Sequence, residues 1–395
     1  MTNSWQEVSL KEVAKPISRS VPVEAGTEYR TIGVKWWGMG AYERETIDGS
    51  RTAAKTLSIV REGDLIINKI WVRHGSVAIA GKDVDGCAGS GEFPTFELDL
   101  NCIEPKWIHW QTKMKSFWGK CDSFSQGTSG KNRIKPELFL TIKIPLPPLE
   151  VQRRILERIE VIADRIAKAQ SLREEADREM EILRDALLLR VFSNLEKQFA
   201  PVYIGESNLS YNNQTRNPQK DNPNREFLYV DIAAVENGTG KITSSQKIMG
   251  SNAPSRARRV IKENDILLST VRPNLKAFAI VPSELDNQIC STGFAVFSNK
   301  PEILPKFLLY QFLSPYFVNQ AIEAVTGGHY PALNDKAINS LQVILPPLDE
   351  QRRIVAYLDS VQARLASLRE LQSQTGEELD ALLPSVLDKA FQGEL

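Results

Sequence analysis

Hydrophobic residues recur at alternating steps of four and three along two long stretches of the chain, residues 155–187 and 354–386. The first stretch carries Ile155, Ile159, Ile162, Ile166, Ala169, Leu172, Ala176, Met180, Leu183 and Leu187. A shift of 199 residues gives the second set, which is Ile354, Leu358, Val361, Leu365, Leu368, Leu371, Thr375, Leu379, Leu382 and Val386. This spacing places one apolar stripe along a helix, and a stripe of this length is typical of a coiled coil. The pattern therefore predicts a spacer coiled coil whose seam begins at Ile155, Ile159, Ile162, Ile166 and at Ile354, Leu358, Val361, Leu365.

Paired prolines precede both stretches and set where the helices begin. Pro147-Pro148 and Pro346-Pro347 cannot lie inside a helix, so we expect the helices to span residues 150–194 and 349–395. Pro384 should kink the second helix or end its regular part. Ordinary core helices are the alternative, but their length and charged outer faces favour two long helices packed on each other.

The same prolines belong to an internal repeat. The string Leu-Pro-Pro-Leu-Glu-Val-Gln-Arg-Arg-Ile at 146–155 returns as Leu-Pro-Pro-Leu-Asp-Glu-Gln-Arg-Arg-Ile at 345–354. We expect Gln152 and Gln351 to satisfy backbone groups or to pair across the junction between helix and globule. The globular segments repeat more faintly, because Asp64-Leu-Ile-Ile67 matches Asp265-Ile-Leu-Leu268.

These anchors divide the chain into four parts. They are domain 1 (residues 1–149), a central spacer helix (150–194), domain 2 (195–348) and a C-terminal spacer helix (349–395). Short runs such as Ile266–Ser269 and Phe294–Phe297 are predicted to be strands. Residues 107–117 and 305–325 are predicted to be helical, the latter with a break near Pro315. The fold class is α/β (α+β): two mixed α/β domains in tandem, each followed by a long helix. The two helices should form an antiparallel coiled coil with pseudo-twofold symmetry.

Composition limits the function without naming it. The formal net charge is zero, yet the parts outside the two helices hold 35 basic and 30 acidic residues, a bias compatible with DNA binding. No stretch is apolar enough to span a membrane, and residues 1–20 lack a signal-peptide core. The four cysteines show no Cys-x-x-Cys spacing and suggest reduced thiols, so we expect a cytoplasmic protein.

A search for catalytic motifs finds no candidate. The segment Gly127-Thr-Ser-Gly-Lys131 lacks the leading glycine of a phosphate-binding loop, and no Gly-x-Gly-x-x-Gly or Gly-x-Ser-x-Gly is present. His74, His109 and His329 are scattered, with no metal-ligand spacing. We therefore expect no catalytic residue, no metal and no enzyme activity on this chain.

The duplicated motif resembles that of the specificity (S) subunits of type I restriction–modification systems. The approach to each copy, Gly127–Ile134 and Thr326–Leu333, fits the same family. The resemblance implies that each domain is a target-recognition domain for one half of an asymmetric bipartite DNA site, with the helices setting the gap. It also implies two methyltransferase subunits that use S-adenosylmethionine to modify adenine N6, and a restriction (R) motor-nuclease that uses ATP and magnesium. No cofactor is expected on this chain.

Candidate DNA contacts are Arg, Lys, Asn, His and Tyr residues in predicted loops, because such groups read base edges and phosphates. In domain 1 they are Lys69, Arg73, His74, Lys131, Asn132 and Arg133. In domain 2 they are Arg256, Arg258, Arg259, Arg272, Asn274, Lys276, His329 and Tyr330. The alternative for each is a solvated surface charge. Trp36 and Trp37 are expected in the core rather than on DNA, because adjacent residues of a strand face opposite ways.

Two other functions remain open from the sequence. One is a protein–protein scaffold whose helices organise other subunits without touching DNA, and the other is an enzyme with a degenerate site. Divergent, loop-rich, basic surfaces on the domains would favour DNA reading, whereas exposed apolar patches would favour the scaffold.

Overall fold

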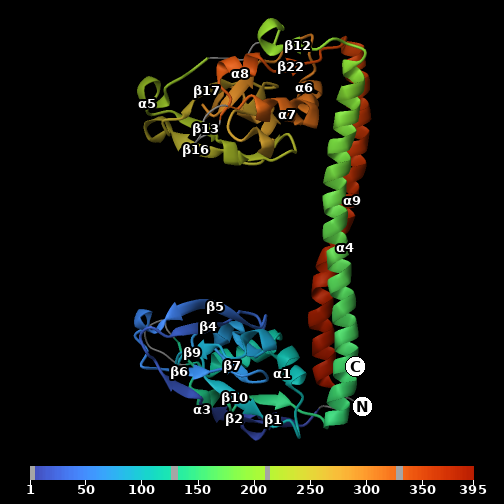
Figure 1. The fold of residues 1–395 in the computed structure, drawn as a ribbon. Coiled ribbons are helices and arrows are strands. Elements are labelled where there is room, and N and C mark those ends of the chain that lie inside the picture. The colour runs from blue at the N-terminus through green and yellow to red at the C-terminus, as the bar shows by residue number, and fades with distance from the viewer. Residues whose placement is uncertain (1–4, 126–131, 210–213, 326–331) are drawn as a thin grey trace. The chain divides into compact units, whose positions relative to one another are not determined.

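The computed structural model describes residues 5–125, 132–209, 214–325 and 332–395. The chain folds as two compact units: unit 1 is Met1–Arg173 with Ser373–Leu395, and unit 2 is Glu174–Gln372. Each unit therefore contains one globular domain together with parts of both long helices, α4 (Leu149–Glu196) and α9 (Leu348–Gln392) (Figure 1).

Domain 1 contains two main sheets and one short pair. A five-stranded sheet has the order β3-β6-β9-β4-β5 and a four-stranded sheet the order β2-β10-β7-β8. The strands are β1 (Glu7–Ser9), β2 (Ala14–Ile17), β3 (Ser20–Pro22), β4 (Glu28–Val34), β5 (Ala41–Asp48), β6 (Thr56–Ile59), β7 (Leu65–Ile67), β8 (Val77–Ile79), β9 (Ala88–Gly89), β10 (Thr95–Leu98) and β11 (Lys143–Pro145). All neighbours are antiparallel except β4 and β9, which pair in parallel at Thr31 and Ala88. β1 pairs with β11, so the two ends of the domain meet beside the start of α4.

Three helices complete domain 1: α1 (Pro105–Gln111), α2 (Lys115–Ser123) and α3 (Pro136–Phe139). The predicted helix over 107–117 is thus two helices, divided between Gln111 and Lys115. The buried faces of α1 and α2 cover β7 and β10, and they form one core with both long helices.

In unit 1 the start of α4 packs antiparallel against the end of α9. Ile155, Leu156 and Ile159 share the core of domain 1 with Leu387 and Phe391. Farther along, the Gln170 side chain donates to Asp380 at 2.8 Å, and Arg173 donates to the Thr375 hydroxyl at 2.6 Å. Residues later in α4 contact residues earlier in α9, which confirms the antiparallel pairing in this unit.

Domain 2 repeats this plan, and the strands common to both domains have the same order in their sheets. Its sheets have the orders β16-β13-β20-β17 and β19-β18-β21, with short pairs β12-β22 and β14-β15. The strands are β12 (Val202–Tyr203), β13 (Glu226–Val230), β14 (Val235–Glu236), β15 (Lys241–Ile242), β16 (Gln246–Met249), β17 (Ala257–Ile261), β18 (Ile266–Ser269), β19 (Phe278–Ile280), β20 (Gln288–Ser291), β21 (Phe294–Phe297) and β22 (Gln342–Val343). Again one parallel pair, β13 with β20, lies in the larger sheet.

The helices of domain 2 are α5 (Pro218–Asp221), α6 (Pro305–Leu313), α7 (Pro315–Glu323) and α8 (Asp335–Asn339). The predicted break near Pro315 is confirmed, because the Ser314 hydroxyl accepts from the Phe317 amide and starts α7 there. In unit 2 the antiparallel pairing recurs: Leu188 and Phe192 of α4 share a core with Ile354 and Leu358 of α9.

The two domains attach to their helices by the same contacts. Gln152 is fully buried; its amide nitrogen donates to the carbonyls of Cys102 and Pro147, and its oxygen accepts from the Glu104 amide. Gln351 makes the three corresponding bonds, to Glu302, Pro346 and Leu304. The predicted role of both glutamines in satisfying backbone groups is confirmed.

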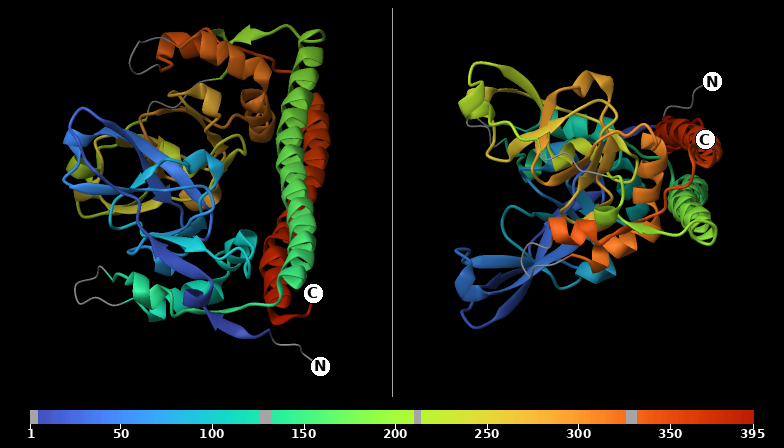
Figure 2. Two further views of the ribbon diagram at one scale, coloured as in Figure 1. Left: turned by 60° about the horizontal axis from the view of Figure 1, so that its bottom comes forward. Right: turned by 90° about the horizontal axis from the view of Figure 1, so that it is seen from above.

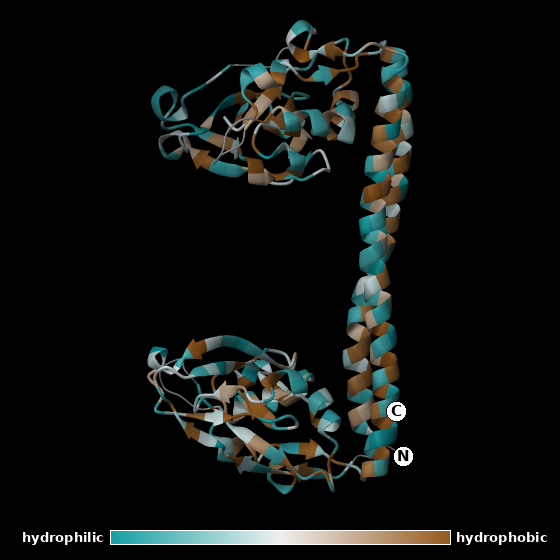
Figure 3. Cartoon of the chain, viewed as in Figure 1, coloured by the Kyte–Doolittle hydropathy of each residue, from teal (hydrophilic) through white to brown (hydrophobic). Residues whose placement is uncertain are grey.

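The structure narrows two predictions about the helices. α9 continues past Pro384 to Gln392, so of the two expected effects of this proline, a kink or an end, the helix does not end there. The stripe is also not buried throughout, because Leu172, Leu183, Leu368, Leu371 and Leu382 are exposed. Hydrophobic and hydrophilic residues alternate along both helices (Figure 3), and burial concentrates where a globular domain covers them.

Of the seam residues, Ile155, Ile159, Ile166, Ile354 and Leu358 are buried, whereas Ile162, Val361 and Leu365 are half-buried. The predicted fold class is confirmed: two mixed α/β domains in tandem, each followed by a long helix, and α4 lies beside α9 within each unit (Figure 2). The pseudo-twofold axis stays a prediction.

Candidate nucleic-acid interface

Corresponding loops meet on one surface of each domain. In domain 1 the β7–β8 loop (residues 68–76) meets the β4–β5 turn (residues 35–40), and the Gly38 amide donates to the Gly75 carbonyl at 2.8 Å. In domain 2 the β18–β19 loop (residues 270–277) meets the segment after β13, and the Gly238 amide donates to the Lys276 carbonyl at 2.9 Å. These matching bonds identify equivalent positions in the two domains.

The meeting point in domain 1 depends on left-handed backbone at three residues. Trp37, Gly38 and Gly75 have φ of 56°, 66° and 74°. A Cβ on Gly75 would collide with the Trp118 indole nitrogen, and one on Gly38 would lie 2.6 Å from the Thr112 carbonyl oxygen, so both positions require glycine. Trp37 adopts this conformation with a side chain, and its amide donates to the His74 carbonyl at 2.7 Å.

These loops present an aromatic cluster of Trp36, Trp37, Trp71 and His74. The ring centroids of Trp36 and Trp71 lie 5.2 Å apart, those of Trp36 and His74 5.3 Å, and those of Trp71 and His74 5.8 Å. The three indoles remain 41 %, 55 % and 37 % exposed in chain order. The expectation that Trp36 and Trp37 belong to the core is therefore wrong: neither lies on a strand, so alternation does not bury one of them.

The candidate DNA-contacting residues of domain 1 differ in their burial and in their bonding partners. The Lys69 and Arg73 side chains are half-buried in the β7–β8 loop, and the Nε of Arg73 has no hydrogen-bond partner. Arg133 forms an ion pair with Glu92 at 3.0 Å. Asn132 is half-exposed, and Lys131 lies outside the described residues.

In domain 2 the equivalent loops line a hollow of about 640 Å³. Its polar lining comes from Asn237, Arg256, Thr270, Arg272 and Thr292. By the matching backbone bonds and loop positions, Asn237 corresponds to Trp37 and Arg272 to Trp71. The two domains thus hold unlike side chains on a similar frame.

Arg272 and Lys276 flank the short helical turn of Pro273–Leu275 with left-handed φ of 50° and 53°. Non-glycine residues pay for this conformation, and such strain gathers at functional sites. The Arg272 and Asn274 side chains are exposed. Lys276 instead donates to Asp185 of α4 at 2.6 Å, so its charge holds the loop to the helix.

The basic run of domain 2 does not form one surface. Arg256 is exposed at the hollow, whereas Arg258 donates to the carbonyls of Pro254 and Ala257. Arg259 is half-buried and lies opposite Cys290 in the β17–β20 register. His329 and Tyr330 lie outside the described residues.

Cys290 and His109 lie outside these loops and have shifted pKa values. Burial raises the pKa of the Cys290 thiol to about 12 and lowers the pKa of His109 to about 4. Within the described ranges, no group of three or more His, Cys, Asp or Glu residues has the geometry to hold a metal ion. Nor does any helix of that part of the chain have the length and apolar character that a membrane crossing needs.

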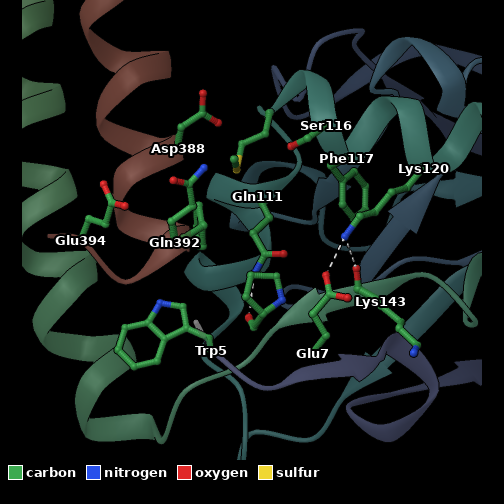
Figure 4. Close-up of a pocket in the computed structure, with 13 residues that line it drawn as sticks. Trp5, Glu7, Gln111, Ser116, Phe117, Lys120, Lys143, Asp388, Gln392 and Glu394 are labelled. Carbon is green, nitrogen blue, oxygen red and sulfur yellow. Dashed lines mark hydrogen bonds and ion pairs between the residues drawn. The ribbon is translucent and has the colours of Figure 1, made fainter. Parts of the chain in front are cut away.

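A cavity of about 500 Å³ lies where domain 1 meets the end of α9 (Figure 4). Its lining includes Glu7, Asp388 and Glu394, and Lys120 points to Glu7 and to the Lys143 carbonyl. Because carboxylates repel phosphate, this cavity does not suit DNA. The exposed loops described above remain the stronger candidate surface.

The fold and the paired loops define a tandem-domain protein whose two domains present unlike loop surfaces. The family described as type I restriction modification DNA specificity domain matches residues 2–176 and 205–374. The chain belongs to this family.

Known relatives agree with this assignment. The chain is 24% identical over 298 residues to the type I restriction enzyme EcoKI specificity subunit of Escherichia coli (strain K12). The match covers 72% of this chain and 64% of that relative, which is less than two thirds of its length.

Two solved structures share the fold. One, from work on complex assembly and conformational transition of the type I R-M system, has a TM-score of 0.73 at 24% identity, covering 100% of this chain and 99% of that chain. The HsdS subunit from Thermoanaerobacter tengcongensis has a TM-score of 0.57 at 24% identity, covering 100% and 98%.

Proposed function

We propose that this chain is the DNA-reading subunit of a type I restriction–modification complex. Each globular domain reads one half of an asymmetric bipartite site. The observation that carries the proposal is the pair of equivalent loops, which hold Trp37 and Trp71 in domain 1 but Asn237 and Arg272 in domain 2. A shared frame with unlike reading groups suits two unlike half-sites.

The long helices act as the spacer between the half-sites. α4 has 48 residues, which corresponds to about 70 Å of helix. Half-sites read from one face of DNA lie about 34 Å or a multiple of it apart. A helix pair of this length can hold two reading domains at such a separation.

The chemistry resides on other subunits. Two methyltransferase subunits using S-adenosylmethionine dock on this chain and methylate adenine N6, and a motor-nuclease subunit with ATP and magnesium joins them for restriction. This chain has no cofactor in the proposal and contributes base contacts and phosphate contacts only. Arg256, Arg272 and Asn274 are the domain 2 groups best exposed for that role.

The test is to co-express the chain with its cognate methyltransferase and map N6-methyladenine across the host genome. The methyltransferase expressed alone is the control. A split, asymmetric motif with a fixed gap, seen only with this chain, is the expected result. If the complex forms and the methylation pattern is that of the methyltransferase alone, the chain does not read DNA and a scaffold role replaces the proposal.

A further inference from the structure

The aromatic cluster of domain 1 is an exposed surface that the fold does not need for its core. Burying a tryptophan contributes more to stability than exposing it, and isolated exposed residues are common. Here three indoles gather on two loops, and Trp37 adopts a left-handed φ of 56° while its ring stays exposed. A cluster assembled at a cost in backbone strain indicates binding.

The loops that carry Trp36 and Trp71 favour a polyanion over a protein surface. Trp37 instead lines a hollow with Glu160 and Asp164 of α4 and Asp380 of α9, so the inference rests on Trp36 and Trp71. The two loops, residues 35–40 and 68–76, contain Lys35, Lys69, Arg73 and His74 but no Asp or Glu. The Nε of Arg73 is buried and has no hydrogen-bond partner, so the guanidinium is not fully held by the domain. Aromatic rings bordered by cations match the stacked bases and phosphates of DNA.

Domain 2 gives independent support. Its equivalent loops carry Asn237 and Arg272, the amide and guanidinium groups that read adenine and guanine edges. Because the two loop surfaces occupy equivalent positions in the two domains, we expect them to bind the same kind of ligand. We propose, on the basis of the proposed function, that domain 1 contacts DNA through Trp36 and Trp71. These two rings stack on bases at a deformable base-pair step of its half-site.

The distances between the aromatic rings limit how they can contact a base. Trp36, Trp71 and His74 are already in mutual contact, with centroids 5.2–5.8 Å apart, so no base fits between them. A base must stack on an outer face of the cluster, which requires it to leave its own stack in part. Pyrimidine–purine steps unstack most easily, so the half-site of domain 1 should contain one at the contact.

The experiment measures DNA affinity of the complex with its methyltransferase on a duplex carrying the mapped site. The variants are Trp36→Leu/Trp71→Leu, which keeps apolar area, and Trp36→Phe/Trp71→Phe, which keeps a planar ring. Leu100→Ala, at an exposed apolar residue of the same domain, is the matched control. Thermal melting of each variant confirms that it folds.

The leucine variant should bind about tenfold to a hundredfold more weakly, and the phenylalanine variant within about threefold of the original. The slope of log affinity against log salt should not change, because the lost contact is uncharged, whereas Arg73→Gln should lower it by about one. Replacing the pyrimidine–purine step should cancel the difference between the leucine variant and the original.

Equal DNA affinity of the leucine variant and the original would overturn the inference. Weaker assembly with the methyltransferase, at unchanged DNA affinity of the assembled complex, would also overturn it and assign the cluster to a protein partner. If the unmodified complex does not prefer its mapped site, the proposed function itself fails, which is a separate result.

Discussion

The two globular domains share a frame and differ at the surface it presents. Each is joined to its long helix by a buried glutamine, Gln152 or Gln351, which makes the same three hydrogen bonds to backbone groups. Both bring two loops together with a matching backbone hydrogen bond, at Gly38 or Gly238. Yet domain 1 fills these loops with indoles, whereas domain 2 lines a polar hollow with Arg256 and Arg272.

This difference separates the residues that the fold requires from those that the proposed DNA reading would use. The glutamines are interior groups, and any change to them leaves buried polar atoms unpaired. The loop side chains are exposed, so they can change without disturbing the core. A repeated scaffold can therefore acquire two specificities while both domains keep one way of attaching to the helices.

The largest effect should come from the shared frame. Gln152→Leu and Gln351→Leu should each lower the free energy of unfolding by about 3 kcal/mol, because each leaves one buried and two part-buried backbone groups without partners. Chemical denaturation measures this. Gln374→Leu, at an exposed glutamine of α9, is the control and should change stability by less than about 0.5 kcal/mol. A small loss at only one of the two buried positions would show that the frames differ.

Arg272→Gly should separate stability from recognition in domain 2. Glycine accepts the φ of 50°, so the variant should be about 1 kcal/mol more stable. Loss of the guanidinium should weaken DNA binding about tenfold to a hundredfold. Denaturation and DNA titration test the two halves of this prediction, and unchanged binding would remove Arg272 from the reading surface.

Lys276→Met, at the other end of the same turn, should lower stability and leave DNA binding unchanged. The Lys276–Asp185 pair joins the loop to α4 at 2.6 Å, and its loss should cost about 1 kcal/mol of stability. DNA affinity and its salt slope should stay the same. A salt slope lowered by about one would mean that Lys276 contacts a phosphate after all.

The smallest effect concerns pH. His109 of α1 lies where α6 has Leu309, and burial, with a contribution from Lys113, lowers the pKa of His109 to about 4. Because the unfolded histidine titrates near its ordinary value of 6.5, stability is intact above pH 6.5 and falls as pH drops towards 4. At pH 5.5 the loss should be about 1 kcal/mol relative to His109→Leu. Denaturation of both proteins between pH 5 and 7.5 checks this, and parallel curves would contradict it.

The long helices and the repeat could be predicted because they depend on local pattern. Proline pairs place the start of α4 and α9 to within a residue, and an alternating stripe gives their antiparallel seam near the domains. The exposed middle of the stripe could not be predicted, since leucines at seam spacing look alike whether or not a globular domain covers them. Pro384 stays inside α9 although proline usually ends a helix.

The proposed reading surface is harder to predict for a physical reason. Arg272 and Asn274 are predicted DNA contacts because basic and amide groups in a loop suggest this role, and the structure shows that both are exposed. The sequence predicts Trp36 and Trp37 in the core, because two adjacent tryptophans alone do not indicate the left-handed turn that exposes them. The Gly38-Met39-Gly40 segment next to the pair was the available signal for that turn.

The central claim is that each domain reads its own half-site. Its most direct test replaces residues 202–343, the segment closed by the β12–β22 pair, with the corresponding segment of a family member that reads a different motif. N6-methyladenine is then mapped in cells that express the hybrid with its methyltransferase. One half of the motif should change while the other half and the gap stay the same. A motif that changes in both halves, or in neither, would contradict the account.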